Sequence, residues 1–331
     1  MKATWIATVA LLAGSGLPAA GQDSELVWRD GKWVRLPAPA EGTPAGELAL
    51  IRRDVDAGDY DKAVKHAKAY LKRYPADAGR EEVYCLAGEA ELRRGKHWPA
   101  HVWYKKLLDE FPNGKRLERA LEREMEIAKA FLAGKKRRIG KVLVISAKSD
   151  GIEILEQIAQ RVPGTQQAQQ AMLTVADHYF AEEKWGDAAD GYDQFLKLFP
   201  KSSHAPRAEQ QAAESFRRAY RGPLFDETPL IEAEQRYKAF ARNHPAAAAE
   251  ADVSGLLEAI HAERARKQYE VGQFYVRTDE PEAATYYFEL VAKDFADTDW
   301  AGRARAALAG LAGRGPRQPA KDAATDKEGK S

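Results

Sequence analysis

A repeated spacing of small, aromatic and helix-ending residues constrains the fold of this chain more than any other feature. Six segments end in a large residue followed by Pro or Ala: Tyr74-Pro75, Phe111-Pro112, Val162-Pro163, Phe199-Pro200, His244-Pro245 and Phe295-Ala296. Proline ends a helix because it lacks an N–H group and its ring clashes with the preceding turn. These pairs therefore predict the ends of six helices.

The residues before each predicted helix end follow the same order. Ala or Gly stands twelve residues before the second member of each pair, at Ala63, Ala100, Gly151, Ala188, Ala233 and Ala284. Eight residues before stand Ala67, Tyr104, Leu155, Tyr192, Tyr237 and Phe288. Five before stand Tyr70, Leu107, Ile158, Phe195, Phe240 and Val291. These spacings place all three positions on one helical face.

The spacing predicts an all-α fold of about six helical hairpins over residues 46–312. We expect the small residue to let the two helices of a hairpin approach closely, and the aromatic one turn later to fill the seam between neighbouring hairpins. A single hairpin cannot bury its own apolar face, so the hairpins are expected to stack as an α-solenoid.

The N-terminal residues 1–21 have the pattern of a signal peptide. Lys2 precedes a short apolar run, Trp5–Gly14, and small residues at Ala19-Ala20-Gly21 fit a cleavage site. The alternative is an ordinary buried helix, but nothing amphipathic follows. We therefore expect export to the periplasm. The only cysteine, Cys85, lies far from this segment, so the sequence predicts no lipid anchor.

Residues 22–45 are interpreted as an N-terminal arm and linker. Asp30-Gly31 between apolar flanks predicts a short β-hairpin. Trp28 and Trp33 would lie close together across it, either packed on the first helices or exposed as a docking arm. Residues 37–44 have the composition of a linker. At the other end, residues 313–331 have almost no large apolar residues and are predicted to be disordered.

Two insertions interrupt the repeats. The first, residues 134–148, combines the bases Lys135–Arg138 with the apolar run Val142–Ile145, and the second is Gly222–Pro229. Loops that project from a solenoid often contact partners. The alternative for Lys135–Arg138 is a solvated helix C-terminus, where bases interact favourably with the helix dipole.

With this pattern the chain resembles the tetratricopeptide repeat (TPR) family, whose repeat is a helix pair of about 34 residues. The matching residues are Gly88, Gly95, Ala100, Tyr104 and Pro112 in the second unit, Ala176, Tyr179, Ala188, Tyr192 and Pro200 in the fourth, and Gly272, Tyr275, Ala284 and Phe288 in the sixth. The resemblance implies a right-handed solenoid. The intervals between helix ends, 37 to 51 residues, are longer than the standard repeat.

A bulky residue late in the second helix of each unit points to one particular family of TPR proteins. Phe195 and the ending Tyr192–Ser202 are similar to the BamD-like family, the periplasmic TPR subunit of the outer-membrane β-barrel assembly machinery. The resemblance implies a non-enzymatic scaffold that binds protein or peptide partners, among them a β-barrel assembly protein. Because the sequence predicts no lipid anchor, we expect this chain to reach the membrane only through its partners. The missing lipidation cysteine is a departure from that family.

The sequence contains no pattern that predicts a catalytic site, a metal site or a cofactor. A net charge of +1 gives no reason to expect nucleic acid. His97 and His101 have helical ligand spacing, but Trp98 stands where a zinc protease would have Glu. Asp177-His178 is interpreted as a surface pair rather than part of a triad. An exported hydrolase or metal enzyme would need a convergent polar cluster.

Partner binding is expected on the first helix of each hairpin, because these helices line the groove of TPR solenoids. The positions transferred from the resemblance are Arg52, Glu89, Arg93, Asp177, Phe180, Gln273 and Arg277. Mixed charges with one aromatic suit a peptide or protein strand. The alternative function is an envelope adaptor similar to the trimeric cell-division coordinator of the Tol–Pal apparatus, although residues 22–46 lack the coiled-coil heptads of that protein.

Overall fold

The computed structural model describes residues 26–29, 32–35, 40–140 and 143–313. The predicted signal peptide, residues 37–39 of the predicted linker and residues 314–331 of the predicted disordered tail lie outside these residues. The chain divides into two compact units, residues 1–158 and 159–331.

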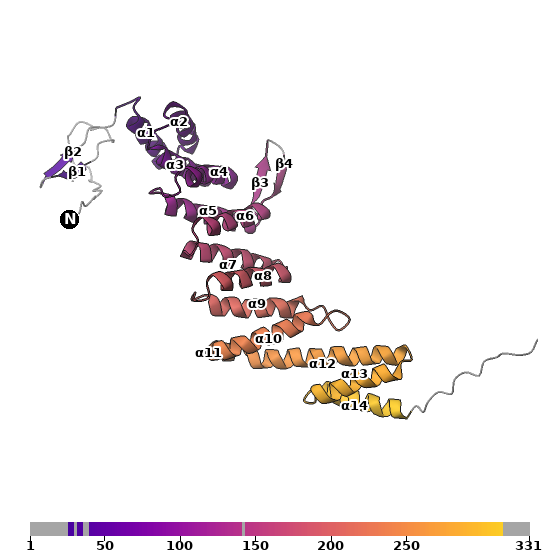
Figure 1. Cartoon of the computed structure of the whole chain (residues 1–331). Coiled ribbons are helices and arrows are strands. Elements are labelled where there is room, and N and C mark those ends of the chain that lie inside the picture. Colours follow the sequence, from indigo (N-terminus) through magenta and orange to yellow (C-terminus); the bar gives the residue numbers. More distant parts are fainter. Residues whose placement is uncertain (1–25, 30–31, 36–39, 141–142, 314–331) are drawn as a thin grey trace, which may run out of the picture. The chain divides into compact units, whose positions relative to one another are not determined.

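The chain begins, within the described residues, with the predicted β-hairpin. Strands β1 (Leu26–Arg29) and β2 (Lys32–Arg35) are antiparallel, and Trp28 pairs with Trp33 in the backbone register. The expected hairpin is therefore confirmed (Figure 1). The side chains of both tryptophans lie outside the described residues, so their predicted packing remains a prediction.

The first unit consists of helical hairpins that follow one another along the chain. Its helices are α1 (Pro44–Asp56), α2 (Tyr60–Arg73), α3 (Arg80–Arg93), α4 (His97–Glu110), α5 (Leu117–Leu132) and α6 (Lys148–Arg161), whose last turn belongs to the second unit. Pairs α1/α2 and α3/α4 form hairpins, and α5 packs on α4 (Figure 1).

The second unit continues the same pattern. Its helices are α7 (Gln166–Ala181), α8 (Trp185–Leu198), α9 (Ala205–Ala219), α10 (Thr228–Asn243), α11 (Pro245–Glu250), α12 (Val253–Arg277), α13 (Pro281–Asp294) and α14 (Asp299–Ala312). Hairpins α7/α8, α9/α10 and α12/α13 pack in sequence, and α14 covers α13 (Figure 1). The all-α class with stacked TPR-like hairpins is confirmed.

The three repeated positions form the core of both units. All eighteen residues at these positions are buried. Five of the predicted helix ends carry a cap residue whose N–H bonds to the carbonyl four residues back, as Phe199 does to Phe195 at 2.8 Å. These helices therefore end where the pairs predict, and the residues that the spacing places on one face are buried.

The aromatic residue of the repeat packs inside its own hairpin, which corrects the expectation that it fills only the seam between hairpins. The ring of Tyr104 on α4 lies directly on Gly88 of α3, and Phe288 on α13 lies on Gly272 of α12 in the same way. A Cβ at residue 88 would stand 2.7 Å from the Tyr104 ring, and one at residue 272 would stand 2.6 Å from the Phe288 ring. Glycine is therefore required for close helix contact.

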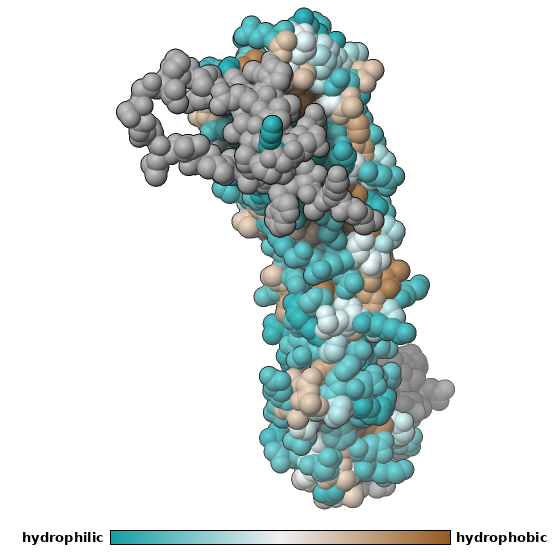
Figure 2. Space-filling model, turned by 90° about the vertical axis from the view of Figure 1, so that its left-hand side faces the viewer, coloured by the Kyte–Doolittle hydropathy of each residue, from teal (hydrophilic) through white to brown (hydrophobic). Residues whose placement is uncertain are grey.

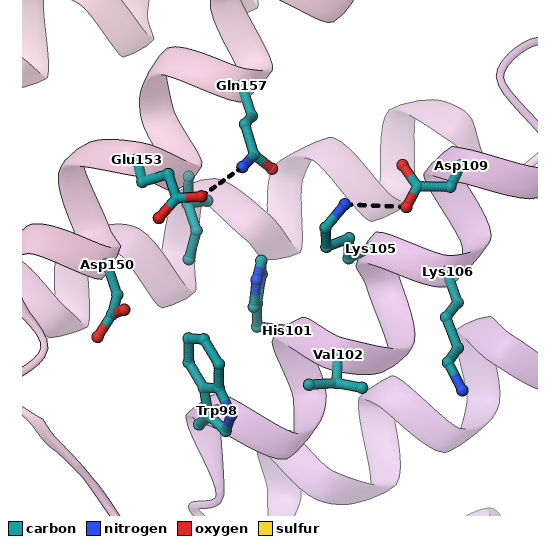
Figure 3. Close-up of a pocket in the computed structure, with 10 residues that line it drawn as sticks. Trp98, His101, Val102, Lys105, Lys106, Asp109, Asp150, Glu153 and Gln157 are labelled. Atoms are coloured by element: carbon teal, nitrogen blue, oxygen red, sulfur yellow. Dashed lines mark hydrogen bonds and ion pairs between the residues drawn. The ribbon is translucent and has the colours of Figure 1, made fainter.

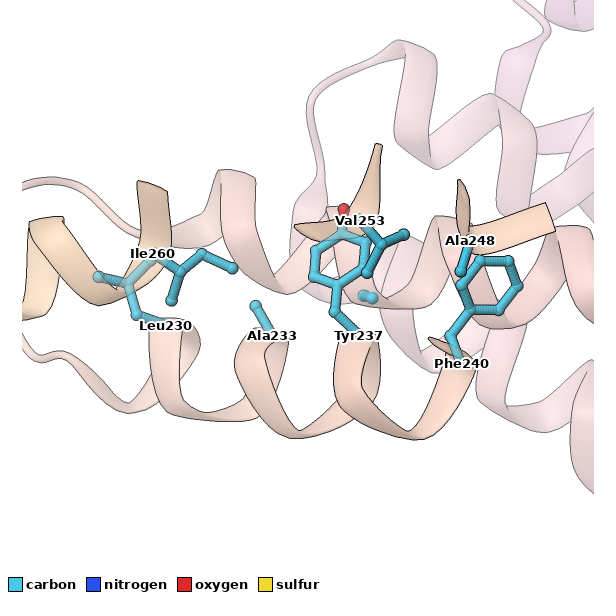
Figure 4. Close-up of a cluster of buried hydrophobic side chains, with 8 residues drawn as sticks. Leu230, Ala233, Tyr237, Phe240, Ala248, Val253 and Ile260 are labelled. Atoms are coloured by element: carbon cyan, nitrogen blue, oxygen red, sulfur yellow. The ribbon is translucent and has the colours of Figure 1, made fainter. Parts of the chain in front are cut away.

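One apolar cluster shows how the long interval in the second unit is filled. Residues Leu230, Ala233, Tyr237 and Phe240 point from α10 toward Ala248 of α11 and toward Val253 and Ile260 of α12 (Figure 4). Burial of a side chain such as Phe240 contributes roughly 1.5–3 kcal/mol. The short helix α11 therefore serves to continue the core between α10 and α12.

The insertion after α5 is a second β-hairpin, which the sequence did not predict. Strand β3 (Lys136–Ile139) pairs antiparallel with β4 (Leu143–Ser146). Helix α5 has already ended at Leu132, so the interpretation of Lys135–Arg138 as a helix C-terminus is wrong. In Figure 1 this hairpin projects from the helices near α6.

Each helix buries one apolar face, and the surface that remains exposed is mostly polar. Figure 2 shows a face on which hydrophilic residues predominate and apolar residues occur in small groups. None of the described helices is both long and apolar enough to span a bilayer.

Candidate functional site

The seven predicted groove residues all lie on first helices of hairpins. Arg52 is on α1, and Glu89 and Arg93 are on α3, in the first unit. The second unit holds the other four, Asp177 and Phe180 on α7, and Gln273 and Arg277 on α12. We call the seven residues the first-helix set.

Glu89 bonds to side chains of two other helices. Its carboxylate accepts hydrogen bonds from Arg123 of α5 at 2.8 and 2.9 Å and from the Tyr104 hydroxyl at 3.3 Å. Arg93, one turn away, lies 3.4 Å from the same carboxylate. The Glu89 side chain is only 16% exposed, and its contacts join α3, α4 and α5.

Asp177 has the same role in the second unit. It accepts a hydrogen bond from the Tyr192 hydroxyl on α8 at 2.6 Å and another from Arg207 on α9 at 2.8 Å. Burial, followed by the hydrogen bond to Asp177, raises the pKa of the Tyr192 hydroxyl above its ordinary value. These bonds connect three consecutive helices.

A third hairpin repeats the tyrosine–carboxylate contact. Tyr237 of α10 donates its hydroxyl hydrogen bond to Glu214 of α9 at 2.8 Å. In the last hairpin the aromatic is Phe288, which has no hydroxyl, and the acid is replaced by Gln273, whose amide instead bonds to Tyr269 at 2.9 Å. An acid thus follows the small residue where the aromatic is a tyrosine.

Glu214 is a carboxylate whose ionised form is strongly stabilised by its neighbours. Burial alone would raise its pKa, but hydrogen bonds from Arg217, Arg218 and Tyr237 outweigh it and hold the pKa of Glu214 at about 2. The side chain is 15% exposed. Such a carboxylate stays ionised across the physiological range and supports the fold.

The other members of the first-helix set are more open. Arg52 bonds to Glu82 of α3 at 2.6 and 2.8 Å but keeps half of its side chain exposed. Arg93 is 61% exposed, and Arg277 is also exposed. These arginines can reach a partner without breaking a core contact.

Phe180 belongs to an aromatic cluster that the sequence did not predict. Its ring meets that of Trp185, on α8, edge to face with centroids 5.2 Å apart. The guanidinium of Arg218, on α9, lies 5.3 Å from both ring centroids. In the sequence, Trp185 follows Phe180 by five residues, which is the one local signal for this pair. No spacing rule connects either ring to Arg218.

A pocket of about 390 Å³ lies between α4 and α6 (Figure 3). Trp98, Val102 and Ile154 supply its apolar lining. Its rim carries two intrahelical hydrogen bonds, Lys105 to Asp109 and Gln157 to Glu153, each 2.9 Å long. The sequence placed no site here, because α4 and α6 come together only in the fold.

The histidine pair considered for a metal has other partners. Nδ1 of the buried His101 lies 2.7 Å from Glu124 of α5, whereas Nδ1 of His97 lies 3.1 Å from the Gly95 carbonyl. Within the described part of the chain, no group of three or more His, Cys, Asp or Glu side chains is arranged to hold a metal ion.

These features define the class: a helical-repeat protein of TPR-like hairpins tied together by tyrosine–carboxylate contacts. The profile of one family, YfiO, described as outer membrane lipoprotein, matches residues 141–324, more than half of the chain. The chain belongs to the YfiO family, which confirms the resemblance to BamD-like proteins. The hairpins α1/α2 and α3/α4, helix α5 and strand β3 precede the match.

Three solved structures of TPR proteins match this chain at low sequence identity. A TPR protein from Parabacteroides merdae is 14% identical, with 79% of this chain and 98% of that chain covered and a TM-score of 0.34. A thermophilic TPR protein from Thermus thermophilus is 17% identical, with coverage of 66% and 98% and a TM-score of 0.28. The TPR2AB domain of yeast Sti1, in a complex with pHSP90, is 13% identical, with coverage of 82% and 86% and a TM-score of 0.31. No curated protein matches the sequence significantly.

Proposed function

We propose that this protein is a non-enzymatic periplasmic scaffold that binds protein partners in the assembly of outer-membrane β-barrel proteins. The observation that carries the proposal is membership of the YfiO family over residues 141–324, together with the repeated hairpins that present the first-helix set. Helical repeats with exposed charged and aromatic side chains suit the capture of an extended or helical protein segment.

In this proposal residues 1–21 direct export, and the protein works at the outer membrane through its partners. The family is described as lipoproteins, yet the only cysteine of this chain, Cys85, is buried on α3. A thiol buried in a helix is not accessible for acylation, so we propose attachment without a lipid on the chain.

The structure separates the first-helix set into two groups for testing. Glu89 and Asp177 hold helices together, so their replacement would confuse loss of fold with loss of binding. Arg93 and Arg277 are exposed and can be replaced without removing a buried contact. They are the informative positions.

The test is photo-crosslinking in the envelope. A photo-reactive residue at position 93 or 277 is expected to capture a component of the β-barrel assembly machinery. The matched controls are positions 65 and 198, exposed on the second helices α2 and α8, and are expected to capture much less. Capture of Tol–Pal components from the first helices would favour the cell-division adaptor instead. Equal capture from all four positions would contradict the proposed surface.

A further inference from the structure

The β3–β4 hairpin is a segment of concentrated positive charge. Residues 134–149 contain six bases and no acid, whereas the whole chain has a net charge of only +1. Lys135, Lys136 and Arg138 are exposed. On β4, Leu143 and Val144 expose 57% and 50% of their surfaces. Packing against the helices does not explain why the hairpin exposes both bases and large apolar side chains.

One base of the hairpin, Arg137, contacts both neighbouring helices. Arg137 lies over the ring of Trp98 on α4, 4.2 Å from its centroid. Its Nε is also 3.0 Å from the carboxylate of Asp150 on α6. An ion pair and a cation–π contact from one guanidinium fix the root of the hairpin beside the pocket. Lys136 and Arg138, on the same strand, are therefore presented in a defined direction.

Strand alternation determines which side chains are presented. Arg137 pairs with Ile145 in the register, on the face toward Trp98, while Lys136 and Arg138 are on the opposite face with Val144. Successive side chains of a strand point to opposite faces. Leu143 and Val144 therefore expose apolar surface on both faces of the same end of the hairpin.

Three kinds of partner could cover bases and apolar groups together: an added β-strand, a protein groove and a lipid surface. Strand addition is disfavoured because both strands are only four residues long and carry Lys and Arg, features that protect sheet edges from pairing. A protein groove would also cover one face of the hairpin and leave the other exposed. A bilayer interface surrounds an inserted end on all sides.

We propose that the β3–β4 hairpin is a direct contact for an anionic phospholipid surface. Lys135, Lys136 and Arg138 interact with the headgroups, and Leu143 and Val144 enter the boundary of the acyl chains. Bases near an anionic membrane surface attract it, and buried apolar groups add to the binding. This contact goes beyond the proposed function, in which partners recruit the protein to the membrane, because it adds a direct lipid contact that requires no partner.

The experiment measures partitioning of the full protein, purified after export, onto vesicles. Vesicles of phosphatidylcholine with phosphatidylglycerol are compared with phosphatidylcholine alone. Each base contributes a factor of about five, so the double variant K136A/R138A should bind the anionic vesicles about 30-fold more weakly. The double variant L143S/V144S should weaken binding about tenfold, and this loss should persist at high salt, which screens only the charges.

Matched controls separate the hairpin from general surface effects. The variant K65A/K68A removes two exposed bases of α2, and L198S removes an apolar side chain that is 57% exposed. Both are expected to bind within about twofold of the unchanged protein, and circular dichroism checks that every variant is folded. Equal binding to both vesicle types, or equal loss in hairpin and control variants, would overturn the proposal.

The result is independent of the proposed function. Vesicle binding that fails while crosslinks from position 144 reach an envelope protein would make the hairpin a protein contact and would overturn the lipid proposal. Crosslinks from positions 93 and 277 test the scaffold separately. Loss of those crosslinks with intact, hairpin-dependent vesicle binding would overturn the scaffold alone.

Discussion

The hydroxyl of Tyr192 lies 2.6 Å from the carboxylate of Asp177, which also accepts a hydrogen bond from Arg207 over 2.8 Å. One carboxylate therefore joins α8 to α7 and α7 to α9. Tyr104 with Glu89 and Tyr237 with Glu214 repeat the contact. A position that the sequence assigned to partner binding serves the stacking of the repeats.

Replacement of Tyr192 by Phe is expected to lower the free energy of unfolding by roughly 1.5–3 kcal/mol, the range for a hydrogen bond to a charged group. The ring stays buried, so only the hydroxyl contact is lost. The control Tyr286→Phe removes a hydroxyl from a residue that is 61% exposed and should change stability by less than about 0.5 kcal/mol. Urea denaturation measures both. Equal losses would show that the Asp177 contact contributes nothing specific.

The repeat positions could be predicted from sequence because their signals are local. Each helix-ending pair fixes the register of the preceding helix, so residues such as Ala188 and Phe195 are placed on one face by counting back. Both are fully buried. The BamD-like resemblance came from the same spacing.

The contacts of the candidate site could not be predicted in this way. The spacing placed Asp177 on a helix face but could not show that Arg207, thirty residues later, would bond to it. The β3–β4 hairpin was missed because four bases after a helix fit a solvated helix end. The contacts that Arg137 makes with Trp98 and Asp150 follow from the fold and not from any local spacing.

Replacement of Gly88 by Ala is expected to destabilise the protein. A methyl group at this position would stand 2.7 Å from the Tyr104 ring, which is held between α3 and α4. Overpacking costs about 1–3 kcal/mol, which exceeds the gain of up to about 1 kcal/mol from higher helix propensity.

The matched control for Gly88 is Gly302→Ala on α14, where a Cβ would have no neighbour within 4 Å. It should be neutral or stabilising by up to about 1 kcal/mol. Thermal denaturation gives both values. A stabilised Gly88→Ala protein would mean that the close helix contact is not needed.

Glu214 should make stability depend on pH in acid. The pKa of Glu214 is about 2 in the folded protein, against an ordinary value of 4.5. Its contribution to the free energy of unfolding is therefore fully present above about pH 4.5 and is lost as the pH falls toward 2. At about 1.4 kcal/mol per pKa unit, the loss amounts to a few kcal/mol.

The control for this pH dependence is Glu214→Gln, measured by denaturation from pH 7 to pH 2. The variant should be less stable at pH 7, and the difference should shrink below pH 4.5. A difference that stays constant over this range would contradict the assigned role of the carboxylate.

The anchor of the β3–β4 hairpin can be tested by amide hydrogen exchange. Replacement of Arg137 by Ala removes the contacts to Trp98 and Asp150 and is expected to accelerate exchange in residues 136–146 by at least about tenfold, because local opening becomes easier. Arg138→Ala, on the exposed face, should leave exchange nearly unchanged. Equal acceleration in both variants would rule out Arg137 as the anchor.

The central claim is that exposed residues of the first helices bind a protein partner while the tyrosine–carboxylate contacts hold the repeats. The most direct measurement is the equilibrium affinity of the purified protein for the partner captured by crosslinking at position 277. Arg277→Glu is predicted to weaken it at least about tenfold, since a reversed charge at an interface costs more than about 1.4 kcal/mol. Lys65→Glu should stay within twofold. Equal affinities for the two variants would contradict the account.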